Sequence, residues 1–154
     1  MPSPRLLIGR RSIVGHYYSI TTIAMGRRRR FVDGANADAV AAEIVGADAC
    51  GSVSTLAWVL MPDHLHWLFR LDSGTLSGTI QRMKLRSAQA INRIEKRHGP
   101  VWQAGFHDHC IRDERSLQGH ARYLIENPLR AGLADKVGDY PHLWCAWTCD
   151  PSGV

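Results

Sequence analysis

The sequence predicts a single α+β domain built on an antiparallel sheet, and three observations indicate this fold class. The chain has 154 residues, the usual size of one domain. Segments rich in β-branched and aromatic residues alternate with longer segments of helical periodicity. Two strand-like segments are joined only by residues 61–63, which implies an antiparallel hairpin. The predicted order, β-α-β-β-α-β plus one further helix, matches the ferredoxin-like arrangement, in which two helices cover one face of the sheet.

The strands are predicted from their composition. "HYYSITTIA" (16–24) is rich in aromatic and β-branched residues, and "SVSTLAWVLM" (52–61) and "HLHWLFRL" (64–71) are predicted as the second and third strands. A fourth strand is expected near the end of "VWQAGFHDHCIR" (101–112). The whole chain should form one domain, with a short N-terminal arm over residues 1–15 and an irregular tail over residues 138–154.

Three helices are predicted from alanine content, periodicity and end signals. Residues 33–50 are alanine-rich, and residues 76–99 repeat apolar side chains at steps of three and four. Asp113 is a suitable N-cap for a last helix, which should run to about Asn127, where Pro128 ends it. This last helix either covers the second face of the sheet or leaves that face open.

The charge balance suits a polyanion. Nineteen Lys and Arg against fourteen Asp and Glu give a net charge of +5, although many basic proteins bind no nucleic acid. No apolar stretch reaches the roughly eighteen residues of a membrane span, and no secretory signal is evident, so we expect a cytoplasmic protein with reduced cysteines. Cys145, Cys149 and a histidine leave a zinc site open as an alternative.

His64 and His66 form the first candidate site. Side chains alternate along a strand, so the two histidines share one face and lie about 6 to 7 Å apart, while Leu65, Trp67 and Phe69 point to the core. Two imidazoles at that spacing can bind one metal ion. An HxH pair also arises by chance in a chain with eight histidines, so the spacing alone does not identify a site.

The last predicted helix carries a second polar group of residues. Tyr123 and Asn127 lie off the apolar stripe of this helix. They are four residues apart and are therefore neighbours around the helix axis. His120 lies three residues before Tyr123 and joins the same side. The alternative is a solvated helix face that ends in an asparagine cap.

Three motifs resemble those of the single-tyrosine HUH transposases, and in particular the REP-associated tyrosine transposases of bacteria. They are "MPDHLHWLF", "VWQAGFHDHCIRDE" and "YLIENPLRAGL", within a resemblance that runs from about Tyr17 to Tyr140. It implies an HUH-nuclease type of fold in which the C-terminal helix is catalytic. His64 and His66 match the metal-binding histidines, Tyr123 the nucleophile and Asn127 the third ligand.

The resemblance also implies an activity. Such proteins nick single-stranded DNA, often near a hairpin, and join ends through a 5′-phosphotyrosine intermediate. We therefore expect a metal-dependent transposase that uses Mg²⁺ or Mn²⁺, binds single-stranded or hairpin DNA at the bacterial nucleoid, and acts as a monomer or homodimer. Imidazole ligands favour Mn²⁺. His120 could accept the tyrosine proton.

Basic side chains supply candidate DNA contacts, although each could be a solvated charge instead. The predicted set is Arg27, Arg28, Arg29, Arg30, Arg70, Arg82, Lys84 and Arg86. Two other functions remain open: a domesticated module that binds hairpin DNA without cutting it, and a metal-dependent hydrolase that uses water.

Overall fold

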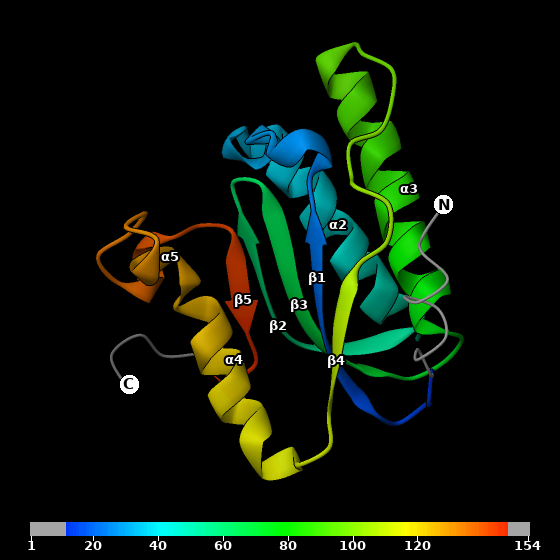
Figure 1. The fold of residues 1–154 in the computed structure, drawn as a ribbon, viewed down its shortest axis with the longest axis vertical. Coiled ribbons are helices and arrows are strands. Elements are labelled where there is room, and N and C mark those ends of the chain that lie inside the picture. Colours follow the sequence, from blue (N-terminus) through cyan, green and yellow to red (C-terminus); the bar gives the residue numbers. More distant parts are fainter. Residues whose placement is uncertain (1–11, 148–154) are drawn as a thin grey trace.

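The computed structural model describes residues 12–147, and within them a five-stranded antiparallel sheet carries helices on both faces (Figure 1). The strands are β1 (Tyr17–Ile23), β2 (Val53–Met61), β3 (His64–Leu71), β4 (His107–Ile111) and β5 (Leu143–Cys145). Their order in the sheet is β4-β1-β3-β2-β5. The first four strands therefore have the order expected for the ferredoxin-like arrangement, with β3 at the centre.

The helices are α2 (Gly34–Ala49), α3 (Leu76–Glu95), α4 (Leu117–Ile125) and the single turn α5 (Asn127–Arg130). Short 3-10 turns span Met25–Arg27, Arg30–Val32, Glu114–Ser116 and Val137–Asp139. Side-chain caps start the two long helices: the Asp33 carboxylate accepts from the Ala35 N–H, and the Thr75 hydroxyl accepts from the Gly78 N–H. No helix within residues 12–147 is both long and apolar enough to cross a lipid bilayer.

Two cores pack against the two faces of the sheet. On one face, α2 and α3 lie side by side over large side chains that include Trp67 and Phe69 of β3. On the other face, Leu117, Ala121 and Leu124 of α4 pack against side chains that include Leu68 of β3. The last helix therefore covers part of the second face, one of the two outcomes that the sequence leaves open.

Several predicted boundaries are wrong in detail. α3 ends at Glu95 rather than near residue 99, because Lys96 adopts a left-handed conformation with φ 54° and the Asn92 side chain donates to the Gly99 carbonyl. Asp113 caps a 3-10 turn, and α4 starts only at Leu117.

The C-terminal end of the last helix also differs from the prediction. α4 stops at Ile125, and Pro128 stands in the first turn of α5 rather than ending the preceding helix, because a proline at that position loses no helical hydrogen bond. The tail predicted to be irregular contains β5, which pairs with β2. Cys149 lies outside the described residues, and Cys145 is buried in the core under α4.

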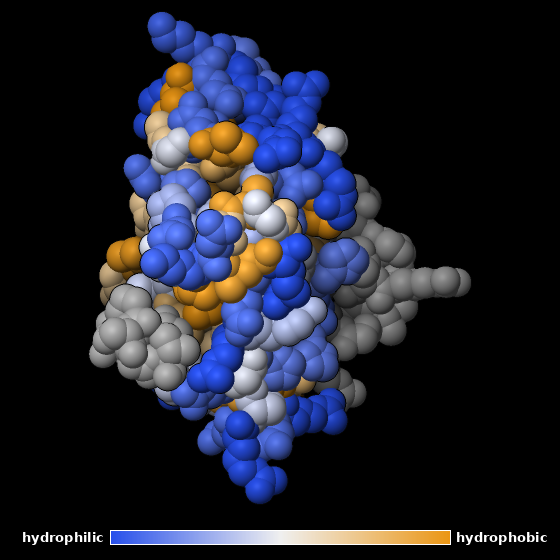
Figure 2. All heavy atoms as spheres, turned by 90° about the vertical axis from the view of Figure 1, so that its left-hand side faces the viewer, coloured by the Kyte–Doolittle hydropathy of each residue, from blue (hydrophilic) through white to orange (hydrophobic). Residues whose placement is uncertain are grey.

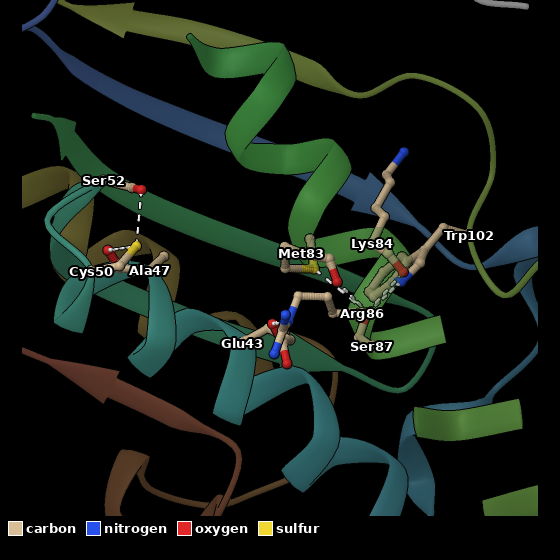
Figure 3. Close-up of polar contacts among 9 residues, drawn as sticks. All are labelled: Glu43, Ala47, Cys50, Ser52, Met83, Lys84, Arg86, Ser87 and Trp102. Atoms are coloured by element: carbon tan, nitrogen blue, oxygen red, sulfur yellow. Dashed lines mark hydrogen bonds and ion pairs between the residues drawn. The ribbon is translucent and has the colours of Figure 1, made fainter. Parts of the chain in front are cut away.

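The segment that leads into β4 is tied to α3 (Figure 3). The Trp102 indole donates to the Ser87 hydroxyl at 3.0 Å, and that hydroxyl donates to the Met83 carbonyl at 2.7 Å. The Lys84 ammonium donates to the Gln103 carbonyl at 2.8 Å and also to the Gly105 carbonyl. Lys84, one of the predicted DNA contacts, therefore holds a loop of the protein.

Candidate active site

The two histidines lie on the face of the sheet that α4 covers. Along β3 they alternate with core residues of the α2–α3 side, as the sequence predicts. Leu68, two residues after His66, belongs to the core under α4. The face is therefore the same for His64, His66 and α4, which is the geometric condition for chemistry between the imidazoles and a side chain of that helix.

The imidazoles of His64 and His66 lie close together, and each has an oxygen partner that orients its ring. Their ring centroids are 4.8 Å apart with the rings at 90°. The His64 Nδ1 is 2.6 Å from the Asp63 carboxylate, and the His66 Nδ1 is 3.0 Å from the Thr21 hydroxyl. With the proton on Nδ1, each ring donates to its oxygen partner, which leaves both Nε2 atoms as ligands for a cation. A partner on the second nitrogen is the usual arrangement of metal-binding histidines.

The surroundings favour a neutral His66. Burial lowers the pKa of His66 to about 4, assisted by the nearby charges of His64 and Arg130. A neutral imidazole is the form that binds metal. For Asp63, burial acts to raise the pKa, but the hydrogen bond and charge of His64 and the charge of Arg27 outweigh it, so the pKa of this carboxyl lies below its usual value. Asp63 is thus an ionised acceptor for His64.

Tyr123 is contacted by Arg130, a residue with no predicted role. The tyrosine is 66% exposed at the C-terminal end of α4. The guanidinium carbon of Arg130 lies 3.8 Å from the centroid of its ring, and the same guanidinium donates to the Tyr123 carbonyl at 2.5 Å. Since Arg130 is also close enough to affect His66 electrostatically, one side chain links the tyrosine to the histidine pair.

Asn127 lies directly after α4, where its amide nitrogen donates to the Leu124 carbonyl at 3.2 Å. Its Oδ1 retains the capacity to bind a cation. α5, which Asn127 begins, packs against β2, the strand beside His64 and His66. Within residues 12–147 no three His, Cys, Asp or Glu side chains are grouped to hold a metal ion. Imidazole nitrogens and an amide oxygen are donors that a divalent ion accepts, and Asn127 as the third ligand beside His64 and His66 stays a prediction.

His120 lies near β4, the edge strand of the sheet. Its ring centroid is 6.0 Å from that of His109 on β4, whereas Tyr123 contacts Arg130. A role as proton acceptor for Tyr123 stays a prediction. His107 and His109 of β4 lie on the same face of the sheet as His66, because Thr21 of β1 stands opposite both His66 and His107 and Ser19 stands opposite His109.

The predicted DNA contacts fall into two groups. Several are engaged within the protein: Arg30 pairs with Glu95 at 2.5 Å, and Arg86 pairs with Glu43 at 3.0 Å across α2 and α3 (Figure 3). Arg27 pairs with Asp63 while remaining largely exposed. For Arg28, Arg29 and Arg82 no ion pair is found among residues 12–147.

Arg70 shares the histidine face but is distant along it. Four residues of β3 separate it from His66, about 13 Å of strand, and its guanidinium is held by Asp72 at 2.7 Å. It is therefore placed for a neighbouring phosphate rather than the one beside the histidines. Figure 2 shows the side of the molecule that carries α4, α5 and β5; hydrophilic residues cover most of it, with smaller hydrophobic patches near the middle.

A ferredoxin-like sheet that presents two histidines to a tyrosine-bearing helix defines a class of DNA-processing protein, the transposases with an HUH motif. The chain belongs to the IS200-like transposase family, described as "Transposase IS200 like", which it matches over residues 12–127.

Individual relatives agree with this family. The chain is 29% identical over 99 residues to a candidate REP-associated tyrosine transposase of Haemophilus influenzae, covering 57% of this chain and 56% of that protein. It is 29% identical over 87 residues to the REP-associated tyrosine transposase of Escherichia coli, covering 55% and 50%. The chain thus spans about half the length of these curated relatives.

Two solved structures show the same fold. One is a REP-associated tyrosine transposase bound to a REP hairpin, with a TM-score of 0.73 and 23% identity over 93% of this chain and 82% of that one. The other is a candidate transposase from Deinococcus radiodurans, with a TM-score of 0.52 and 18% identity over 76% and 94%. The predicted fold class and family are therefore confirmed.

Three residues of the site had no predicted role: Thr21, Asp63 and Arg130. Asp63 and Arg130 stand inside the motifs "MPDHLHWLF" and "YLIENPLRAGL", so their position next to the candidate ligand and nucleophile was an available signal. Thr21 has no such signal, because only the pairing of β1 with β3 places it beside His66.

Proposed function

We propose that this protein nicks single-stranded DNA and transfers the strand through a 5′-phosphotyrosine intermediate on Tyr123. The observation that carries the proposal is the docking of α4 on the histidine face, where Arg130 contacts Tyr123 and its charge acts on His66. A helix docked on the other face would separate the tyrosine from the histidines by the thickness of the sheet.

The reaction uses the exposed phenol of Tyr123. Its oxygen attacks the phosphorus of a phosphodiester, an O–P bond forms, and the phenolic proton passes to a base. The bond from phosphorus to the 3′ oxygen breaks, and this oxygen leaves as a 3′-hydroxyl after taking up a proton. Attack by a second 3′-hydroxyl on the phosphotyrosine restores the phenol and joins a new strand, so the energy of the phosphodiester is conserved.

The remaining side chains orient the reacting groups and neutralise the charge of the phosphate. His64, His66 and Asn127 would hold a divalent ion, which supplies positive charge to the phosphate oxygens when bound. Asp63 and Thr21 fix the two imidazoles through Nδ1. Arg130 restrains the ring of Tyr123, and its guanidinium is suited to a phosphate oxygen.

The substrate we propose is single-stranded DNA beside a hairpin. The net charge of +5 favours a polyanion, and one structural neighbour is bound to a REP hairpin. Arg28, Arg29 and Arg82 are exposed and suited to backbone phosphates.

Incubation of the protein with hairpin oligonucleotides carrying single-stranded flanks and Mn²⁺ tests the proposal. A covalent protein–DNA adduct that survives SDS is expected, and both Tyr123→Phe and EDTA should abolish it. Cleavage without an adduct would indicate a hydrolase that uses water. Binding without cleavage, unchanged by Tyr123→Phe and by EDTA, would indicate a domesticated hairpin-binding module.

A further inference from the structure

The loop between β1 and α2, residues 24–33, lies against the turn that leads into the histidine pair. The N–H of Ala24 donates to the Asp63 carbonyl at 2.9 Å, and the N–H of Phe31 donates to the Pro62 carbonyl at 3.1 Å. Figure 1 shows the loop and the β2–β3 turn at the same end of the sheet. We call this segment the arginine loop, because it contains four consecutive arginines. Its side chains therefore border the candidate active site.

Arg30 fixes the far end of the arginine loop. Its guanidinium pairs with the Glu95 carboxylate of α3, and only 11% of its side chain is exposed. The buried Asn36 amide donates to the Arg30 carbonyl at 2.9 Å and to the same Glu95 carboxylate at 3.0 Å. Arg30 is thus occupied by protein contacts, and these contacts hold the loop against the body of the protein.

Arg27 has a strained backbone within this loop. Its φ is 51°, directly after Gly26 with φ 65°. Within residues 12–147, Arg27 and Lys96 are the only residues other than glycine with a positive φ. L-amino acids with a side chain rarely adopt this conformation, and where they do, the residue often stands at a functional site. The strain therefore favours a functional role for the Arg27 side chain.

Arg27 shares one carboxylate with a histidine of the candidate site. The Arg27 Nη1 is 3.4 Å from the Asp63 Oδ2, and the His64 Nδ1 is 2.6 Å from the Asp63 Oδ1. The Arg27 side chain is 61% exposed, and an ion pair this long and this exposed contributes little to stability. The guanidinium thus retains N–H donors for an anion beside His64.

We propose that Arg27 binds the DNA phosphate next to the scissile phosphate, on the His64 side of the histidine pair. The inference rests on the proposed function for the location of the scissile phosphate. Only one carboxylate links the guanidinium of Arg27 to the imidazole of His64. Since every nucleotide carries a phosphate, a strand with one phosphate at the histidines brings the next within reach of Arg27. The planar guanidinium matches two phosphate oxygens at once.

The test removes the charge of one DNA phosphate at a time. Hairpin oligonucleotides carry a single methylphosphonate, which is neutral, at successive positions of their single-stranded flanks. Their affinity is measured in metal-free buffer for full-length protein with Tyr123→Phe, so that no strand is cut, and for versions that also carry Arg27→Gly or Arg27→Asn. Glycine and asparagine both tolerate a positive φ, so these replacements remove the guanidinium without adding strain. Thermal melting of each protein without DNA accompanies the binding assay.

Arg115→Ala is the matched control. The Arg115 Nε is 3.4 Å from the Asp113 Oδ1, so this arginine also makes a long, exposed pair with an aspartate. It follows the end of β4 that pairs with Tyr17, whereas His64 stands opposite Ile23 at the other end of β1. Loss of Arg115 therefore removes a comparable charge far from the histidines.

Arg27→Gly should weaken binding of the unmodified hairpin about tenfold, because a hydrogen bond to a charged group is lost. The slope of log affinity against log salt should become shallower by about 0.7, the value for one phosphate of a single strand. At one flank position, the methylphosphonate should weaken binding for the Tyr123→Phe protein and the Arg115→Ala control but have no further effect with Arg27→Gly. That position should adjoin the phosphate that the wild-type protein cleaves. The melting temperature with Arg27→Gly should not fall.

Three outcomes would overturn the inference. Unchanged affinity with Arg27→Gly would mean that Arg27 serves only as a partner of Asp63. Equal sensitivity to every methylphosphonate with and without Arg27 would mean that it contacts no particular phosphate, and an effect far from the cleaved position would place the contact elsewhere. Arg27→Asn decides these points if Arg27→Gly fails to fold. Because the readout is binding without metal, failure of the wild-type protein to form an adduct would refute the proposed function and leave the phosphate contact measurable.

Discussion

Replacement of Arg130 tests the part of the site that is least evident from the sequence. The guanidinium lies 3.8 Å from the ring centroid of Tyr123 and donates to the carbonyl of the same residue. A cation–π contact at an exposed site contributes about 0.5 to 1 kcal/mol, and the hydrogen bond adds roughly a further 0.5 to 1 kcal/mol at this exposed position. If the loss of these two contacts raises the activation free energy by about 1 to 2 kcal/mol, the reaction rate falls roughly 5- to 30-fold.

The assay is the single-turnover rate of the covalent adduct at saturating hairpin DNA and Mn²⁺. Arg130→Ala should show the full decrease, and Arg130→Lys should recover only part of it, because an ammonium retains the charge but not the planar stacking. The matched control is Arg115→Ala, which removes an arginine with a 94% exposed side chain just before α4. A wild-type rate for Arg130→Ala at saturation, with only weaker DNA binding, would show that Arg130 contacts DNA and does not position the tyrosine.

Three further outcomes follow from the histidine pair. Burial lowers the pKa of His66 to about 4, so between about pH 6.5 and 4 this histidine is protonated in the unfolded chain and neutral in the folded protein. The metal-free protein should therefore lose up to about 3 kcal/mol of unfolding free energy as the pH falls through this range. Urea unfolding at pH 7 and at pH 4.5 should show a smaller loss for His66→Gln than for the wild-type protein. Asp63→Asn should weaken Mn²⁺ binding about 10- to 100-fold by calorimetry, whereas Asp72→Asn, which alters a carboxylate paired with Arg70, should leave it unchanged. Mn²⁺ should support more cleavage than Mg²⁺ at equal low concentration, because imidazole ligands favour it; the opposite order in a titration would contradict nitrogen ligation.

The sheet was predictable because its signals are local. The alternation in "HLHWLFRL" assigns Trp67 and Phe69 to one face and the histidines to the other, and the short link after β2 allows only a hairpin. β5 was missed because its three residues, Leu143–Cys145, form a strand only by pairing with β2. Their partners in β2 precede them by 84 to 88 residues in the sequence. No window of sequence around β5 contains that information.

The candidate site also combines features that local sequence predicts with features that depend on tertiary contacts. The spacing of His64 and His66, and of Tyr123 and Asn127, places each pair on one side of its own element. What each charge contacts depends on tertiary structure: Lys84 has the same basic character as its neighbours on α3, yet its ammonium binds two carbonyls of the loop before β4. A basic residue on a helix predicts an interaction with a polyanion only when the fold leaves the charge exposed.

The two halves of the site differ in how firmly the fold holds them, and this difference bears on the proposed chemistry. The imidazoles stand on the central strand β3, and their Nδ1 atoms have oxygen partners from β1 and from the β2–β3 turn. Tyr123 is mostly exposed at the end of a nine-residue helix, and Arg130 supplies its ring contact. Imidazoles held in this way would keep the proposed cation in place for the charge that develops on the phosphate. A lightly held tyrosine can approach one strand, carry it as the phosphate ester and present it to another, a step that a fully buried side chain could not perform.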